Sequence, residues 1–289
     1  MQADRVLVSD FDGLWTDVIQ EGAPFTAGYI EDLARLSGLP LNEVQRLARE
    51  RESDVLARPH AYGWTYNGTI VAPASVDPYL RMGPVADLIF DRTNMLRSQS
   101  DRQAVCDLLF LYNYRKTHTV FRPDARRIFE ALAGTQTYIV TNSDPDTVRK
   151  KLRSLDESVP NAPSIAWIID RVHGGARKYV VDATKDLETH PAVAATLTLR
   201  GLERPVHVRR PSYFAVLDDI RRRHEVEWKD VRVVGDIFEL DGALPIALGA
   251  WFGLLANEHT PQYERDFLAS HPRGRILNSL GDVVPFLHE

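Results

Sequence analysis

The sequence predicts a doubly wound α/β fold with a mostly parallel sheet and an inserted helical segment. Short apolar runs alternate with amphipathic stretches in the second half of the chain, at 138–140, 231–234 and 250–255. Strands that alternate with helices form parallel sheets that are covered on both faces. A strand of the same kind lies at 6–8, whereas residues from about 27 to 113 repeat their apolar positions with helical spacing.

The predicted elements of the first half follow from local signals. The strand at 6–8 runs into Ser-Asp-Phe-Asp-Gly, which indicates a buried strand followed by a polar turn. Within the helical segment, residues 39–43 are a plausible helix start and 58–60 a plausible stop. The Asn67-Gly68 pair between the helices favours a tight turn. The residues His60, Trp64, Tyr66 and Asn67 in this region are candidate substrate contacts, with local packing as the alternative.

The second half alternates between the two kinds of element. Each strand is expected to end in a polar turn, and each helix to pack one apolar face on the sheet. The predicted helices and strands are a helix at 125–133, a strand at 138–140, a helix through Val148 and Leu152, a helix at 213–223, a strand at 231–234, a helix at 243–248, a strand at 250–255 and a last helix at 280–287.

Composition limits the function classes. The chain has 289 residues, of which 44% are hydrophobic and 26% charged, with a formal net charge of −5, as expected of a soluble globular protein. This balance argues against a dedicated nucleic-acid binder. The single cysteine, Cys106, excludes an internal disulfide and a thiolate metal cluster. Because neither an export signal nor a membrane span is recognisable, we expect a cytoplasmic protein without membrane contact.

Polar side chains follow the predicted strands at the edge where parallel sheets bind ligands, beyond the carboxyl ends of their strands. Carboxylates from two different strands would form a hard oxygen site that suits Mg²⁺. A carboxylate can also attack phosphorus to form an aspartyl phosphate, while a second carboxyl exchanges protons with the leaving group and with water. The residues in question are Asp10, Asp12, Thr141, Asn142, Asp236 and Asp241.

The order of these pieces resembles the haloacid dehalogenase (HAD) superfamily of phosphohydrolases. Its first motif, a strand followed by Asp-x-Asp-Gly, is matched at 6–13, and its second, a strand followed by Thr or Ser, at 138–142. Its fourth, Gly-Asp-x-x-x-x-Asp, is matched at 235–241. Each motif alone is weak, but all three in order, each behind an apolar strand, make a specific pattern. The resemblance implies a Rossmann-like core and an inserted helical cap.

The resemblance also implies roles for individual residues. Asp10 corresponds to the nucleophile and Asp12 to the general acid and base. Thr141 corresponds to the hydroxyl that holds a phosphoryl oxygen, and Asn142 beside it is a candidate substrate contact. Asp236 corresponds to a direct Mg²⁺ ligand and Asp241 to a supporting one. The carboxylate of Asp10 would also bind the ion, and Asp12 would add its backbone carbonyl.

The third motif of the superfamily, a lysine often followed by proline, is altered. At the corresponding spacing the chain has Arg210-Pro211, so Arg210 is the expected replacement. Arginine grips phosphate bidentately but is not an equivalent point charge. Lys178, after a glycine-rich loop, is the alternative and a candidate substrate-binding residue. The superfamily usually has Thr or Val two residues after its second aspartate, where this chain has Leu14 and Trp15. This difference is interpreted as a variation in packing, with Trp15 as a candidate wall of the substrate pocket. The basic run at 149–151 is interpreted as a solvated helix face.

The expected organisation is a core of residues 1–17 and 119–289, a helical cap of residues 18–118, and an extra insertion at about 159–205. The sequence thus predicts an enzyme, a Mg²⁺-dependent phosphatase that hydrolyses a small phosphorylated metabolite through an aspartyl phosphate. An impaired binding or regulatory protein with the same fold is the main alternative, because the third motif is altered. A haloacid dehalogenase and a nucleic-acid end phosphatase are the remaining alternatives.

Overall fold

The computed structural model describes residues 5–182 and 193–289. The chain divides into two compact units. The first consists of Met1–Asp17, Thr65–Ala72 and Phe121–Glu289, and the second of Val18–Trp64 and Pro73–Val120. Part of the expected insertion at 159–205 lies outside the described residues, because it includes residues 183–192.

The first unit is built on a six-stranded sheet in the order β10-β9-β8-β1-β4-β5. Every neighbouring pair in this sheet is parallel, which confirms the predicted fold class. The order places β1 in the middle, between β8 and β4. The strands are β1 (Val6–Ser9), β4 (Gln136–Val140), β5 (Val172–His173), β8 (Val231–Gly235), β9 (Trp251–Leu255) and β10 (Gly274–Leu277).

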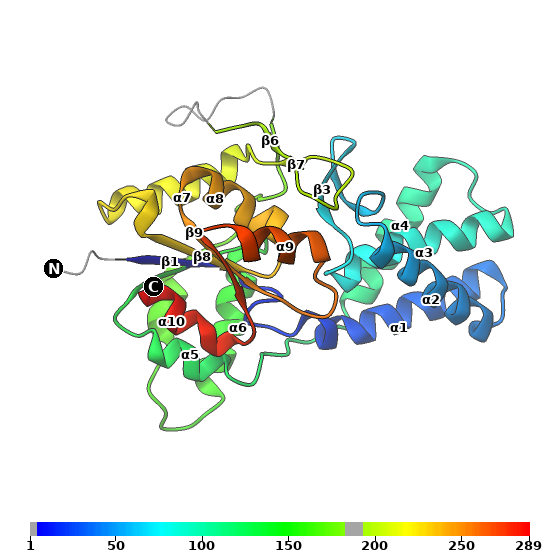
Figure 1. Cartoon of the computed structure of the whole chain (residues 1–289). Helices are drawn as coiled ribbons and strands as arrows, with labels where there is room; N and C mark the ends of the chain where they lie inside the picture. Colours follow the sequence, from blue (N-terminus) through cyan, green and yellow to red (C-terminus); the bar gives the residue numbers. More distant parts are fainter. Residues whose placement is uncertain (1–4, 183–192) are drawn as a thin grey trace. The chain divides into compact units, whose positions relative to one another are not determined.

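Helices cover both faces of this sheet (Figure 1). On β1, Val6 and Val8 pack into one hydrophobic cluster, while Leu7 between them packs into the other, as the alternation of side chains along a strand requires. The first face is covered by α7 (Pro211–Arg223), α8 (Ala243–Leu248) and α9 (Gln262–Ser270), and the second by α5 (Ala125–Ala131), α6 (Pro145–Glu157) and α10 (Val283–His288).

Short elements complete the first unit. The helical turns are η1 (Ala166–Arg171), η2 (Trp228–Asp230) and η4 (Leu280–Asp282), while η3 (Phe238–Gly242) is a π-helical turn. The strands β6 (Thr196–Leu197) and β7 (Val206–His207) form a small antiparallel pair. Single π-helical turns occur often at functional sites, and η3 directly follows the strand that carries Gly235-Asp236.

A two-stranded sheet formed by β2 (Gly63–Tyr66) and β3 (Thr69–Pro73) has its central residues in the first unit. Both residues of its turn have positive φ, 50° for Asn67 and 75° for Gly68. That is the backbone which an Asn-Gly turn favours, so the sequence correctly predicted a tight turn here. We call the residues Thr65–Ala72 the 65–72 hairpin.

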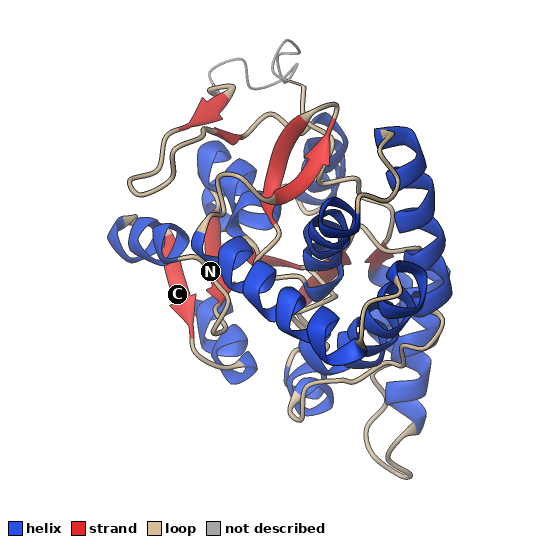
Figure 2. Cartoon of the chain, turned by 90° about the vertical axis from the view of Figure 1, so that its right-hand side faces the viewer, coloured by secondary structure: helices blue, strands red, loops and turns tan. Residues whose placement is uncertain are grey.

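The second unit is almost entirely helical (Figure 2). Its helices are α1 (Val18–Ser37), α2 (Leu41–Ala57), α3 (Pro78–Thr93) and α4 (Gln99–Tyr114). They share one hydrophobic core, which includes Phe25, Leu33, Leu47, Val85 and Phe90. Along residues 5–182 and 193–289, no helix is both long enough and apolar enough to cross a membrane.

Candidate active site

The central position of β1 brings the predicted motifs to one edge of the sheet. Ser9, the last residue of β1, is in register with Ile139 of β4 on one side and with Val234 of β8 on the other. The next residue, Asp10, donates its backbone N–H to the carbonyl of Val234 at 2.9 Å. Residues that directly follow β1, β4 and β8 therefore emerge at the same carboxyl edge, where open parallel sheets bind ligands.

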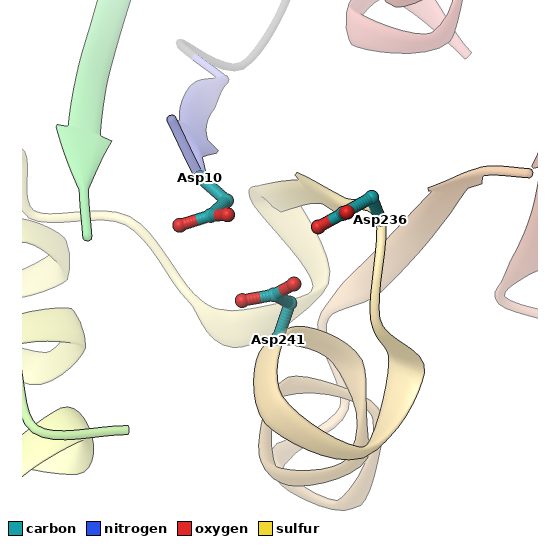
Figure 3. Close-up of side chains that lie close together, drawn as sticks. All are labelled: Asp10, Asp236 and Asp241. Carbon is teal, nitrogen blue, oxygen red and sulfur yellow. The ribbon is translucent and has the colours of Figure 1, made fainter. Parts of the chain in front are cut away.

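Three carboxylates converge at this edge (Figure 3). Asp10 follows β1, Asp236 follows β8, and Asp241 lies in η3. Each offers an oxygen that lies within 4.8 Å of the oxygens offered by the other two. Asp236 and Asp241 are buried, and carboxylates held this close repel one another unless a cation lies between them. The three oxygens fit Mg²⁺, which prefers carboxylate ligands.

Two glycines allow the backbone to approach these carboxylates. Gly13 has a φ of +80°, and a Cβ atom on it would lie 2.1 Å from Oδ2 of Asp236. A Cβ atom on Gly235 would lie 2.4 Å from Oδ2 of Asp241. Both distances are shorter than any real contact, so a side chain at either position would displace a carboxylate. The glycines of the first and fourth motifs thus have a steric reason to be there.

The positive charge at this site comes from Lys178. Its Nζ lies 2.7 Å from Oδ1 of Asp10 and 2.8 Å from Oδ1 of Asp241, and its side chain is only 1% exposed. The lysine belongs to a loop after β5, and two hydrogen bonds connect this loop to the end of β4. The N–H of Lys178 donates to Oδ1 of Asn142 at 2.7 Å. The N–H of Ala176 donates to the carbonyl of Thr141 at 2.9 Å.

Burial and neighbouring charges shift the protonation equilibria here. Burial raises the pKa of Asp10 to about 7; the Lys178 ammonium opposes this rise and the Asp241 carboxylate adds to it. For Lys178, burial lowers the pKa, but Asp10 and Asp241 together outweigh it, so its pKa lies above the ordinary value. A divalent cation bound to the carboxylates would add positive charge and favour the ionised form of Asp10.

Comparison with known proteins shows which solved structures have the same fold as this chain. Neither a protein-family model nor a curated protein matches the chain. A solved structure of a predicted phosphoglycolate phosphatase from Haemophilus somnus 129pt matches with a TM-score of 0.53 and 15% identity, over 99% of this chain and 98% of that one. YfnB from Bacillus subtilis, described as a HAD hydrolase and bound to magnesium, matches with a TM-score of 0.51 and 13% identity, over 100% of both chains.

A Bacteroides fragilis protein, described as a haloacid dehalogenase-like hydrolase, matches with a TM-score of 0.50 and 14% identity, over 97% of this chain and 99% of that one. This chain has the HAD fold. The similarity extends over nearly the whole of each chain, so it includes both compact units of the sequence. At sequence identities of 13–15%, this structural similarity shows the fold alone, and the chemistry has to be argued from the residues of the site.

Within the HAD fold, Asp12 lies beside the carboxylate cluster but is held by other groups. The hydroxyl of Ser143 donates to Oδ2 of Asp12 at 2.6 Å, and Nζ of Lys151 lies 3.1 Å from Oδ1. The Asp12 side chain is 32% exposed, in contrast to the buried pair Asp236 and Asp241. Asp12 is thus available to solvent and to a substrate, as a group that exchanges protons must be.

Thr141 and Asn142 shape the loop after β4. Oγ1 of Thr141 accepts the N–H of Ser143 at 3.1 Å, and the side chain is buried. Asn142 uses Oδ1 to hold the backbone of Lys178. Both residues lie at the carboxyl edge, as predicted, and Asn142 has an additional positioning contact that the sequence did not indicate.

Arg210 differs from the expectation that it replaces the lysine of the third motif. Its guanidinium is fully buried and donates to two backbone carbonyls, those of Lys178 and, at 2.9 Å, Val71. Burial lowers its pKa to about 10, although Glu239 and Asp241 act in the opposite direction. The ammonium that reaches Asp10 is that of Lys178, the alternative candidate in the sequence.

Trp15 is a core residue, contrary to its interpretation as a pocket wall. The side chain has no exposed surface, its ring stacks on Phe129 with centroids 3.8 Å apart, and Nε1 donates to Oγ of Ser9 at 2.9 Å. The turn after Asp12 directs the side chain of Trp15 into the hydrophobic core, where Ser9 accepts the hydrogen bond of its indole N–H. No surface of Trp15 remains for a substrate.

Sequence reasoning missed Ser143 and Lys151. Ser143 lies in the turn directly after the second motif, so its position there was a signal for a contact with Asp12. Lys151 belongs to the basic run that was interpreted as a solvated face, but its side chain is only 18% exposed. It lies on α6 within 5.6 Å of the Phe11 ring, a contact that no spacing rule predicts.

Proposed function

We propose that this protein is a Mg²⁺-dependent phosphatase of the HAD superfamily that hydrolyses a small phosphorylated metabolite. The observation that carries the proposal is the convergence of Asp10, Asp236 and Asp241, with oxygens within 4.8 Å of one another, and the contact of the Lys178 ammonium with two of them, Asp10 and Asp241. The magnesium ion, held by these carboxylates and by the backbone carbonyl of Asp12, would neutralise charge on the transferring phosphoryl group.

The reaction proceeds in two displacements. A carboxylate oxygen of Asp10 attacks phosphorus, the bond from phosphorus to the ester oxygen breaks, and Asp12 gives its proton to that leaving oxygen. In the second step water attacks the phosphorus of the aspartyl phosphate, Asp12 accepts a proton from the water, and the bond to Asp10 breaks. Inorganic phosphate leaves, and Asp10 is a carboxylate again.

The remaining residues position the reacting groups. Lys178 compensates the charge of Asp10 and Asp241 and faces the phosphoryl oxygens, and the Thr141 hydroxyl contributes a hydrogen bond to one of them. Ser143 and Lys151 hold the carboxyl of Asp12 in place. We assign the choice of leaving group to the helical segment at 18–118, since the core motifs are common to many substrates.

The competing functions make different demands on these residues. A dehalogenase of this superfamily needs the nucleophile but has no leaving oxygen for Asp12 to protonate. An impaired binding protein was suggested by the altered third motif, whereas the ammonium of Lys178 beside Asp10 supports an enzyme. The net charge of −5 counts against a phosphatase of nucleic-acid ends.

Phosphate release from a panel of phosphorylated metabolites and an aryl phosphate tests the proposal. The wild type is assayed with Mg²⁺ and with EDTA, beside D10N and the control D146N, whose carboxylate is 87% exposed. We expect release that requires Mg²⁺, is lost in D10N and persists in D146N. Absence of release over the whole panel, or release that D10N retains, would overturn it. Halide release from a 2-haloacid in EDTA would instead support the dehalogenase.

A further inference from the structure

Arg210 connects two segments that are remote in sequence. One guanidinium nitrogen donates to the carbonyl of Lys178, and the other donates to the carbonyl of Val71 in the 65–72 hairpin. All three residues belong to the first compact unit. Arginine suits this arrangement because its planar fork presents several donors at once, whereas the ammonium of lysine is a single point.

The same two segments meet at a second contact. The ring of Tyr66, in the hairpin, packs edge-on against the ring of Tyr179, with centroids 5.9 Å apart and an angle of 61° between the planes. Tyr179 is the neighbour of Lys178 in the chain. The hairpin is thus attached to the lysine loop through a hydrogen-bonded arginine and through an aromatic pair.

Both backbone polar groups of Lys178 are held by side chains. Its N–H donates to Asn142, and its carbonyl accepts from Arg210. These two contacts fix the peptide groups on either side of the Cα atom from which the buried ammonium extends to Asp10. A displacement of this backbone would move the ammonium away from the carboxylates, and displacements of about 1 Å can reduce rates by about a hundredfold.

We propose that Arg210 is a positioning residue, which fastens the lysine loop to the 65–72 hairpin and thereby holds Lys178 in line with Asp10 and Asp241. The proposal rests on the proposed function, in which Lys178 faces the phosphoryl group. The proposal also gives the 65–72 hairpin a role. In the sequence the hairpin lies within the helical segment, but it belongs to the first compact unit and supports the loop that carries Lys178.

The test compares R210K and R210Q with R126K. Arg126 is a matched control, because it is also buried and also donates to backbone carbonyls, those of Leu155, Asp156 and Pro163. We expect the Arg210 variants to lower kcat by about tenfold or more, with a smaller effect on KM, as for a misplaced catalytic group. R126K should lose thermal stability without a change in kcat at temperatures well below its melting point.

Hydrogen exchange provides a readout that does not depend on activity. In R210K and R210Q, the backbone amides of both segments, 65–72 and 176–180, should exchange faster than in the wild type. In R126K the amides of these two segments should exchange at the wild-type rate. K178M keeps the carbonyl that Arg210 binds, so the hairpin in this variant should exchange more slowly than it does in R210K and R210Q. Unchanged exchange in both Arg210 variants overturns the proposal, even if the wild type is an active phosphatase.

The two proposals can fail separately. If the wild type releases no phosphate, the proposed function fails, and exchange in the Arg210 variants still decides whether the arginine fastens the two segments. If the wild type is active and the Arg210 variants have its kcat, Arg210 is a structural residue only. R210Q is made beside R210K so that a failure of one variant to fold leaves the other to decide.

Discussion

The ammonium of Lys178 lies 2.7 Å from a carboxylate oxygen of Asp10, although 168 positions separate the two residues in the chain. Asp10 is brought there by β1, the central strand of the sheet, and Lys178 by a loop after β5, a strand at its edge. The same ammonium lies 2.8 Å from Asp241. One buried cation thus connects the first and fourth motifs of the site.

Replacing Lys178 should affect stability and activity together. K178M removes the cation from a buried cluster of carboxylates, and breaking a buried ion pair on one side costs about 3–5 kcal/mol. We expect a lowered unfolding temperature in EDTA that Mg²⁺ partly restores, because the metal compensates the same carboxylates. A fall in kcat of about 10²–10³ should accompany it, as for the loss of one preorganised electrostatic group.

The control for this prediction is K150M, in which an exposed lysine of the same unit is replaced. Thermal unfolding with EDTA and with Mg²⁺, followed by phosphate release, measures both effects. Equal unfolding temperatures for K178M and K150M would mean that Lys178 does not compensate the carboxylates.

Binding of Mg²⁺ should release a proton below neutral pH. In the absence of metal the pKa of Asp10 is about 7, so its carboxyl is largely protonated at about pH 6, and a metal ligand has to be deprotonated. Affinity for Mg²⁺ should therefore rise with pH up to about 7 and then level off. Titration calorimetry in two buffers of different ionisation enthalpy measures the proton release, and D10N should show none.

The stability of the metal-free protein should depend on pH through the same group. The folded-state pKa of Asp10, about 7, lies above its ordinary value of 3.8, so between these values the folded state retains a proton that the unfolded state has lost. Stability from this group is complete below about pH 4 and decreases as pH rises towards 7. Denaturant unfolding in EDTA should show this decrease in the wild type but not in D10N, where no carboxyl titrates.

Substitution of Trp15 should reduce stability and leave KM unchanged. W15F removes part of a buried stacked ring and the donor of the hydrogen bond to Ser9, for an expected loss of about 1–3 kcal/mol. W167F is the matched control: Trp167 is only partly buried at the same core cluster, and its Nε1 has no hydrogen-bond partner in the part of the chain that the structure describes. A raised KM in W15F would restore the pocket-wall interpretation.

Four strands of the sheet, β1, β4, β8 and β9, and the carboxylates were predictable from sequence because their information is local. The two outer strands, β5 and β10, were not among the predicted ones. An apolar strand followed by Asp10 or Asp236 indicates both the element and the edge at which the side chain emerges, since parallel strands share a direction. The cation was not predictable in this way. Lys178 reaches Asp10 because Asn142 and Arg210 hold its backbone. No spacing rule indicates that Lys178 contacts the carboxylates while Arg210 binds the backbone of Lys178.

The glycine of the first motif provides a test of the metal site. G13A puts a Cβ atom 2.1 Å from Oδ2 of Asp236, so this carboxylate has to move. The substitution also forces alanine into a φ of +80°, at a cost of about 1–2 kcal/mol. G134A separates the two effects, because Gly134 has a φ of +83° but nothing within 4 Å of its added Cβ atom.

We expect both variants to lose a similar part of their stability but only G13A to lose Mg²⁺ affinity. Asp236 is one of three carboxylates within 4.8 Å of one another, and its displacement breaks the arrangement on which the ion depends. Calorimetric titration with Mg²⁺ should show affinity reduced by about tenfold or more in G13A and unchanged in G134A. Phosphate release in G13A should then require more Mg²⁺ for half of its maximal rate. If the two variants bound Mg²⁺ equally well, Asp236 would not be a ligand of the ion, and the three-carboxylate site would have to be abandoned.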